Sequence, residues 1–244
     1  MQGKPFWLLS IATLVAVGVT LSLGRWQLSR AAEKEQMQTS IEVKGKLPVL
    51  DASALLGAPE ADPVTNQALL HRQVVLHGRW LADKTVFLDN RQMNAKPGFY
   101  VVTPLQLAQR TDVVLVQRGW VARNFVDRTR LPVIETPAGA VTVAGRIVPP
   151  PSKLYELGAA DGGTIRQNLD LVQFREETQL PLLALTIQQQ GATSEGLLRA
   201  WPPVASGIDK HYGYAFQWFG LSALITLLYV WFQIVRRFIA PNPR

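Results

Sequence analysis

Two long uncharged segments, one near each end of the chain, restrict most strongly what this sequence can fold into. Twenty residues without a charge separate Lys4 from Arg25, and twenty-four separate His211 from Arg236. About twenty helical residues are enough to cross the ~30 Å hydrocarbon layer of a bilayer. We therefore predict transmembrane helices at residues 6–24 and 211–235. A cleaved signal peptide is the alternative for the first segment, but its apolar stretch is longer than usual and no small-residue cleavage site follows it directly.

The charges outside the two segments predict their orientation. Lys4 precedes the first segment, three arginines follow the second, and neither tail contains an acidic residue. Because short basic tails stay in the cytoplasm, we expect residues 1–5 and 236–244 inside the cell and residues 25–210 outside the cytoplasm. The predicted location is a cell inner membrane, with a large periplasmic domain. The tails also hold more than half of the net charge of +7, so this charge does not indicate a nucleic-acid partner.

The intervening residues predict a β-rich domain. Residues 26–38 are rich in helix formers, so the first helix is expected to continue beyond the membrane. Short helices are expected at residues 52–56 and 170–179, capped by Asp51 or Ser53 and by Asp170, with a loop at residues 58–67. Short β-branched runs bounded by Gly and Pro predict a mostly antiparallel sandwich or barrel, of class α+β, with strands at residues 40–46, 72–80, 85–89, 100–105, 113–121, 141–148 and 183–189.

Patterns that would indicate an enzyme or a metal carrier are missing from the sequence. It contains no cysteine, which excludes thiolate catalysis, disulfides and cysteine-bound metals. It also lacks a phosphate-binding loop, a nucleophile elbow and a zinc-protease motif. His71 and His77 are about 20 Å apart if they lie in one strand, which is too far for a shared metal ion. We expect a protein that is not an enzyme. A membrane-tethered enzyme is the alternative, recognisable by carboxylates that converge in a pocket.

Four segments share their order and spacing with a known family. They read LGRWQLSRAAEKE at residues 23–35, LDNRQMNAKPGFYVVTPL at 88–105, VLVQRGWVAR at 114–123 and HYGYAFQWFGLS at 211–222. Together with the two apolar segments, they resemble the surfeit locus protein 1 family, whose members assist the assembly of haem–copper cytochrome c oxidase, complex IV of the respiratory chain. The resemblance implies a chaperone that contacts oxidase subunit I and possibly other oxidase assembly factors. A protein-binding scaffold that never touches haem is the alternative.

The first motif is typical of a helix that leaves a membrane. We expect Trp26 at the membrane–water interface, where indole rings are enriched. Arg25 and Arg30 are then placed to reach the phosphates of membrane lipids.

The second and third motifs have structural interpretations. Pro97-Gly98 is predicted to form a turn in which Gly98 has a positive φ, and Arg91 beside it either binds an anion or pairs with Asp89. Residues 114–121 alternate as a strand with one buried face does. On that face Arg118 is expected beside Trp120, packed on an aromatic ring.

The fourth motif is the candidate binding site. On a helix, one face carries His211, Tyr214, Ala215 and Trp218, and there an imidazole can bind iron while aromatic rings pack on a porphyrin. The family resemblance implies that haem a is bound transiently, with His211 as the ligand of the haem iron. A histidine within an interfacial belt of aromatic residues is the simpler alternative. The sequence indicates no second axial ligand.

Overall fold

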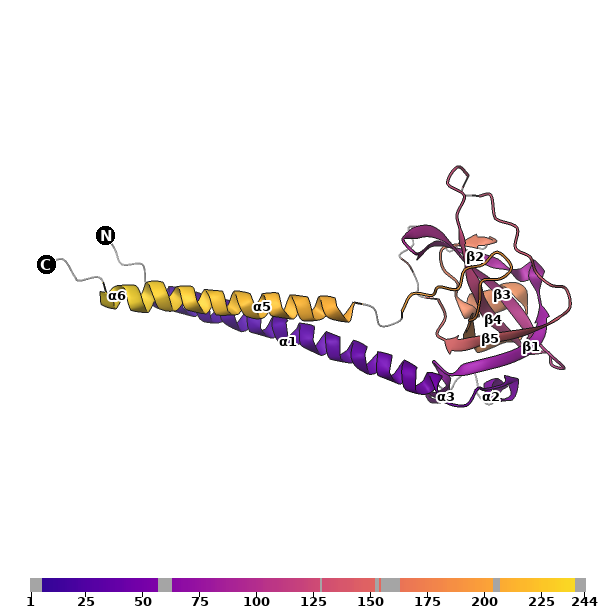
Figure 1. The fold of residues 1–244 in the computed structure, drawn as a ribbon, viewed down its shortest axis with the longest axis horizontal. Coiled ribbons are helices and arrows are strands. Elements are labelled where there is room, and N and C mark those ends of the chain that lie inside the picture. The colour runs from indigo at the N-terminus through magenta and orange to yellow at the C-terminus, as the bar shows by residue number, and fades with distance from the viewer. Residues whose placement is uncertain are drawn as a thin grey trace. The chain divides into compact units, whose positions relative to one another are not determined.

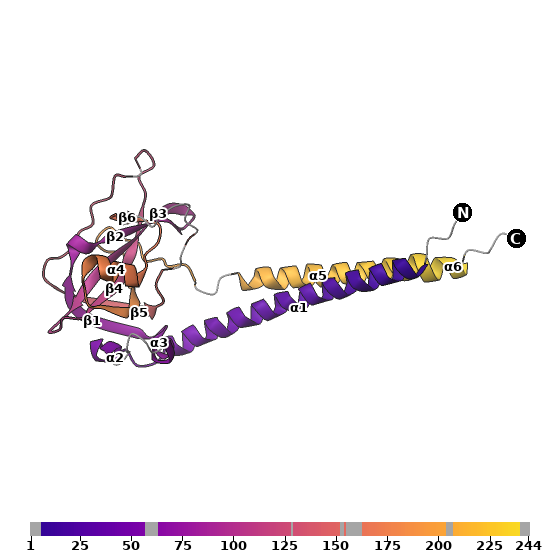
Figure 2. The same cartoon turned by 180° about the vertical axis from the view of Figure 1, so that it is seen from behind.

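The computed structural model describes residues 6–56, 63–127, 129–151, 154, 163–203 and 207–239. The chain forms two compact units, one made of Met1–Thr39 with Pro203–Arg244 and the other of Ser40–Pro202. Figures 1 and 2 show the elements of both units from two sides. The second unit contains the strands.

Two helices dominate the first unit. α1 spans Phe6–Gly45 without a break, and α5 spans Ile208–Tyr229 and continues through a π-helical turn, η2 (Val230–Val235), into α6 (Arg236–Ile239). Both are long and apolar enough to cross a membrane, and only 6% of each apolar stretch is buried inside the structure. The described part of the chain thus leaves most of their apolar side chains exposed, whereas the core helix of a soluble protein would be mostly buried.

α1 extends further than the sequence predicted. Its continuation through residues 26–38 is confirmed, but residues 40–46, predicted as a strand, form its last turns. Ile41 and Val43 favour strands through their branched side chains, yet adding a residue to an existing helix is far easier than starting a new element. The helix ends at Gly45, and Pro48 soon afterwards cannot continue it.

α1 and α5 pack side by side through small and polar residues (Figure 1). The buried positions of α1, which recur at intervals of three and four residues, are Thr20, Gly24, Gln27 and Ala31. A Cβ at Gly24 would lie 2.7 Å from the ring of Phe219, so only glycine permits this approach. Further along the pair, the hydroxyls of Ser10 and Tyr229 are hydrogen-bonded at 2.6 Å.

A closed five-stranded barrel forms the second unit. Its strands are β1 (Gln73–Trp80), β3 (Lys96–Leu107), β4 (Val113–Ala122), β5 (Ala140–Val148) and β7 (Leu182–Gln189). They pair in the order β1-β5-β7-β4-β3, and β3 also pairs with β1, which closes the ring. Of the two predicted architectures, a sandwich or a barrel, the structure has the barrel.

Two further strands extend the sheet beyond the ring. β2 (Val86–Met93) pairs with β3, and the short β6 (Ile165–Arg166) pairs with β2. All of the strand pairs are antiparallel except β2–β6 and β4–β7, so the mostly antiparallel sheet is confirmed. β6 was not predicted, because two residues between loops carry no periodicity.

Side chains fill the barrel and also cover one of its outer faces. The interior cluster includes Leu76, Leu105, Val116, Ile147 and Ile187. On the outside of β3 and β4, a second cluster contains Phe174 from α4 (Leu171–Thr178). The first eight residues of β4 are therefore buried on both faces, and the prediction of one buried face is wrong.

The short helices agree in part with the sequence. As predicted, Asp170 caps α4, where its carboxylate accepts from two backbone N–H groups. α2 (Ala52–Leu56) is also present, and the carboxylate of Asp51 accepts from the N–H of Ser53. α3 (Pro63–Leu69) occupies much of the predicted loop, which is therefore wrong there, while residues 58–62 lie outside the described residues. A 3-10 turn, η1 (Ala82–Lys84), links β1 to β2.

The β2–β3 hairpin turns at Asn94-Ala95, whose φ values of 51° and 59° suit a two-residue turn. The predicted turn at Pro97-Gly98 is wrong, because both residues lie in β3. Gly98 is needed for space instead: a Cβ there would lie 2.2 Å from the carbonyl oxygen of Val121 and 2.6 Å from the ring of Trp120.

His71 is a half-buried imidazole just before β1, with a φ of 70°. Burial lowers its pKa from the ordinary 6.5, and the nearby charges of Arg146 and Lys44 lower it further. The folded protein therefore favours the neutral ring more strongly than the unfolded chain does. Stability from this residue is complete above the unfolded pKa and is lost as the pH falls through the lower folded pKa.

Candidate functional site

His211 lies near the start of α5, and its ring is hydrogen-bonded to α1. The Nδ1 atom of His211 is 2.7 Å from the Oε1 atom of Gln27. Gln27 is 9% exposed, whereas His211 is partly exposed. Because an amide oxygen can only accept, this contact needs a proton on Nδ1, and in the neutral ring Nε2 is then the nitrogen with the lone pair.

The other predicted residues of this face differ in exposure. Tyr214 is 51% exposed and Trp218 is partly exposed, while Ala215 is only 2% exposed. Another contact with α1 lies near them, where the hydroxyl of Tyr212 donates to Glu35 at 2.9 Å. The structure thus places His211 at the seam with α1, and the more exposed ring of Tyr214 and the partly exposed ring of Trp218 lie on the following turns of α5.

This donor set fits a haem iron better than a bare metal ion. Among the described residues, no group of three or more His, Asp or Glu side chains is close enough to hold an ion. A haem needs only one or two protein ligands, because the porphyrin supplies four nitrogens. If a haem were bound, Nε2 of His211 would be the atom to hold its iron, and the rings of Tyr214 and Trp218 would be available to pack on the macrocycle.

The three residues assigned to the membrane interface follow along α1. Arg25 and Trp26 are exposed, the latter by 55%. Arg30 donates to Glu33 at 2.6 Å, one helical turn away, with both side chains about half exposed. Their contact with lipid phosphates stays a prediction.

Arg118, the arginine of the third motif, occupies a β-bulge in β4. Val101 of β3 pairs with Gly119, but the next residue, Val102, pairs with Gln117. The ladder therefore skips Arg118, which is the extra residue of the bulge. An extra residue interrupts the alternation of faces on which the sequence prediction relied.

Because of this bulge, Arg118 and Trp120 do not share a face. Trp120 pairs with Tyr100, and its indole N–H donates to the carbonyl oxygen of Arg91 at 2.9 Å. The guanidinium of Arg118 instead lies 4.8 Å from the ring centroid of Trp80. Packing of Arg118 on a ring from another strand is thus present, but the prediction of Trp120 beside it is wrong.

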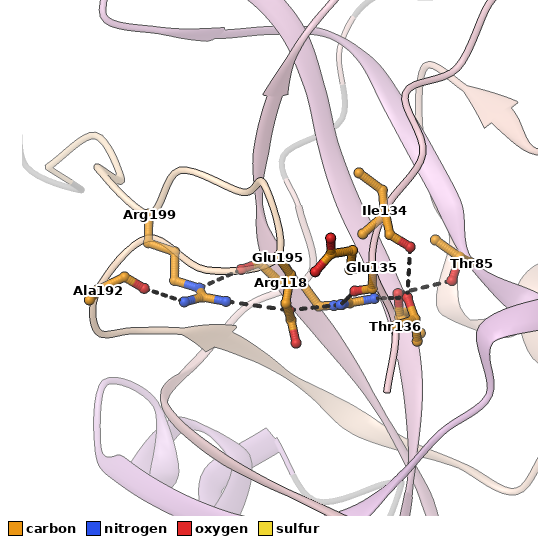
Figure 3. Close-up of polar contacts among 9 residues, drawn as sticks. Thr85, Arg118, Ile134, Glu135, Thr136, Ala192, Glu195 and Arg199 are labelled. Atoms are coloured by element: carbon orange, nitrogen blue, oxygen red, sulfur yellow. Dashed lines mark hydrogen bonds and ion pairs between the residues drawn. The ribbon is translucent and has the colours of Figure 1, made fainter. Parts of the chain in front are cut away.

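The side chain of Arg118 is fully buried, and three acceptors surround it (Figure 3). Its Nη2 atom donates to Glu195 Oε2 and to the carbonyl oxygen of Glu135, each at 2.8 Å. Its Nη1 atom donates to the hydroxyl of Thr136 at 2.7 Å. These bonds are all made by the two Nη atoms, and a buried charge is tolerated only when it is paired and hydrogen-bonded in this way.

Arg199, which is also almost fully buried, shares the same carboxylate (Figure 3). Its Nη2 atom lies 3.6 Å from Glu195 Oε2, its Nε atom donates to the carbonyl oxygen of Arg118, and its Nη1 atom donates to that of Ala192. Burial lowers the pKa of Arg199, and the charge of Glu195 opposes this change. The arrangement fastens the segment 192–199 to β4.

Arg91 of the second motif is a buried structural residue. It is 5% exposed, and its Nη2 atom donates to the carbonyl oxygen of Gln167 at 2.8 Å. Burial lowers the pKa of its guanidinium, which lies 5.9 Å from the ring centroid of Tyr100. Asp89, which the sequence offered as a partner of Arg91, forms an ion pair with Arg123, with 3.7 Å between Asp89 Oδ1 and Arg123 Nη1.

A hollow of about 460 Å³ beside β1 is lined by Asp51, Ser53 and His77, the residue types of a hydrolase. Their hydrogen bonds do not form a catalytic relay. The hydroxyl of Ser53 donates directly to Asp51, while the Nδ1 atom of His77 is 3.0 Å from the hydroxyl of Thr142. A nucleophile needs its hydroxyl bonded to the base, so this hollow does not support the enzyme alternative.

The sequence did not predict the residues that bond to His211 and to Arg118. Gln27 stands next to the predicted Trp26 and is separated from His211 by 184 residues, while Glu195 is 77 residues from Arg118. The one available signal was Gln27 itself, a polar residue on the face of α1 that also carries Gly24 and Ala31.

The fold and the site define a class of protein: a small β-barrel domain carried between two long apolar helices that pack together and present one histidine. A sequence model of the SURF1 family matches residues 14–223, and the chain belongs to that family. A SURF1-like protein of Rickettsia felis is 26% identical over 91% of this chain and 95% of its own length. One from Drosophila melanogaster is 28% identical over 92% of this chain and 77% of its own. Cytochrome oxidase assembly protein SHY1 of Saccharomyces cerevisiae is 25% identical over 44% of this chain and 26% of its own length.

Proposed function

We propose that this chain is an assembly factor for cytochrome oxidase. Membership of the SURF1 family supports this role, as does the similarity to a yeast relative that is named for oxidase assembly. The chain acts by binding and not by catalysis. The partners are oxidase subunit I and the lipids around the apolar helices, and other assembly factors are further candidates.

Within this role, His211 binds the iron of haem a, and Tyr214 and Trp218 pack on its porphyrin. The result is delivery of haem a to subunit I, or stabilisation of that subunit while haem enters. The observation that carries this proposal is the hydrogen bond from Nδ1 of His211 to Gln27, which leaves Nε2 free for iron at the end of an apolar helix pair. Haem itself supplies the hydrophobic ring that such a surface favours.

The two apolar helices span the cell inner membrane, with both tails in the cytoplasm and the barrel on the other side. Their exposed apolar stretches support membrane insertion, because lipid is the solvent that such surfaces need. The basic residues of the tails support the orientation.

A scaffold that binds only proteins is the second candidate. Phe125 and Val126, in the loop after β4, are 74% and 97% exposed. The side chain of Asn124 accepts from the N–H groups of Val126 and Asp127, which holds the loop in shape. Large exposed apolar residues on an ordered loop are suited to contact another protein.

The visible spectrum of protein purified in detergent from cells that make haem a distinguishes the two candidates. We expect the wild type and a His77→Ala control to retain haem a, and His211→Ala to lose most of it. Undiminished haem a with an unchanged spectrum in His211→Ala would contradict the ligand assignment. A wild-type protein without haem a would favour the scaffold.

A further inference from the structure

The hydrogen-bond partner of His211, Gln27, has no role of its own in the proposed function, and its contact indicates a second residue of the site. Gln27 is the buried polar side chain of the α1 seam that hydrogen-bonds across to α5 at the histidine. A buried amide without a hydrogen bond is strongly unfavourable, so the pairing is maintained wherever α1 and α5 are packed.

We propose that Gln27 is a positioning residue that sets the tautomer and the ring orientation of His211, so that Nε2 is the atom presented to a ligand. This inference rests on the proposed function only for the identity of that ligand, a haem iron. In water the two neutral tautomers of histidine interconvert freely, and the bond made by one ring nitrogen decides which form is present.

The chemistry of the acceptor supports this role. The Oε1 atom of Gln27 takes the proton of Nδ1, which makes Nε2 the basic nitrogen and increases its strength as a ligand. An amide does so without burying an unpaired charge in the seam between α1 and α5, where a carboxylate would be costly. The bond also restricts rotation of the imidazole, so the direction of the Nε2 lone pair is fixed before a ligand arrives.

The place of Gln27 on α1 keeps its acceptor oxygen in a fixed position. Gln27 is held by a helix that packs closely on α5, because Gly24, one turn earlier, lies against the ring of Phe219. The acceptor is therefore carried by a rigid element and not by a loop. Partners that orient a metal-binding histidine typically contribute about 10–100-fold to affinity.

Three variants test the proposal. Gln27→Leu keeps the size of the side chain and removes the acceptor. Gln27→Glu keeps an acceptor oxygen at the same reach, whether or not it is protonated. Gln36→Leu is the matched control, the same change at an exposed position of the same helix.

The first measurement needs no haem. Nitrogen NMR of the full-length protein labelled at histidine, in detergent above pH 8, reports which ring nitrogen of His211 carries the proton; His211→Ala identifies the signal. We expect the proton on Nδ1 in the wild type, Gln36→Leu and Gln27→Glu, and a shift toward Nε2 in Gln27→Leu. A wild-type ring protonated on Nε2, or a tautomer unchanged in Gln27→Leu, would overturn the proposal.

The second measurement uses haem a. We expect Gln27→Leu to retain haem a about 10–100-fold more weakly, with Gln27→Glu restoring retention and lowering the reduction potential. Equal retention, spectrum and potential in Gln27→Leu and the wild type would refute the positioning role while leaving the proposed function intact. Absence of haem a from the wild type would instead refute the proposed function, and with it the ligand named here.

Discussion

Removing the carboxylate of Glu195 should destabilise the barrel more than any ordinary surface change. This carboxylate is 2.8 Å from Arg118 and 3.6 Å from Arg199, whose side chains are 0% and 5% exposed. In Glu195→Gln, the buried guanidinium groups of Arg118 and Arg199 repel each other, because only a neutral amide lies between them. The change keeps the size of the side chain and one acceptor oxygen, so it isolates the role of the charge.

The magnitude follows from the burial of the three groups. Breaking a buried ion pair by removing one partner costs about 3–5 kcal/mol. Glu195 is 19% exposed and the new amide can still accept one hydrogen bond, so we expect the lower end, about 3 kcal/mol. For a protein of this size that corresponds to a fall in Tm of about 6–12 °C.

Unfolding of the detergent-solubilised protein by heat and by urea, followed by tryptophan fluorescence, measures this loss. Trp80 lies beneath the guanidinium of Arg118 and reports on the cluster directly. Glu135→Gln is the matched control, because Glu135 contributes only its backbone carbonyl to Arg118. We expect the control within about 0.5 kcal/mol of the wild type. A Glu195→Gln variant equally close to the wild type would refute the argument that this carboxylate neutralises buried charge.

Three other changes have expected outcomes. Gly98→Ala should lower the free energy of unfolding by about 1–3 kcal/mol in the same assay, because the added Cβ has no room, whereas Gly139→Ala has open space and should change it little. His71→Asn should flatten the pH dependence of stability: the wild type should lose free energy of unfolding as the pH falls below about 6.5, and an unaltered slope in the variant would assign that loss to other groups. Gly24→Ala should weaken the pairing of α1 with α5, which would be measured as loss of a cross-link between cysteines placed on the two helices. Gly18→Ala, where the added Cβ has open space, should keep the cross-link, and equal cross-linking in both variants would contradict the close packing at Gly24.

The elements that the sequence predicted well are those whose signal is local. The apolar segments, six of the seven predicted strands and the capped helix α4 each depend on the periodicity or the cap of a few neighbouring residues. The hairpin turn was misplaced because Ala95 adopts a positive φ that alanine rarely takes, while Pro97 and Gly98 offered a more familiar signal.

The parts that the sequence did not predict depend on contacts between distant residues. The bulge at Arg118 is a relation between β3 and β4, and no pattern within β4 indicates where its alternation breaks. The partners Glu195 and Gln27 come from segments 77 and 184 residues away from their arginine and histidine. Residues 40–46 were misread for a related reason, because their local preference for strands is outweighed by the long helix that precedes them.

Because β7 lies between β5 and β4, the barrel cannot close until this last of its strands has been synthesised. While the ribosome is still translating the loop before Leu182, the ring of strands lacks its last member and the edges of β4 and β5 stay open. Arg118 gains its counter-ion later still, because Glu195 follows β7 in the chain. A nascent chain cut short before β7 therefore has an open sheet, and one cut between β7 and Glu195 has the strands but lacks the carboxylate that pairs with Arg118. The barrel therefore lacks this counter-ion until Glu195 has been synthesised, shortly before α5 begins at Ile208.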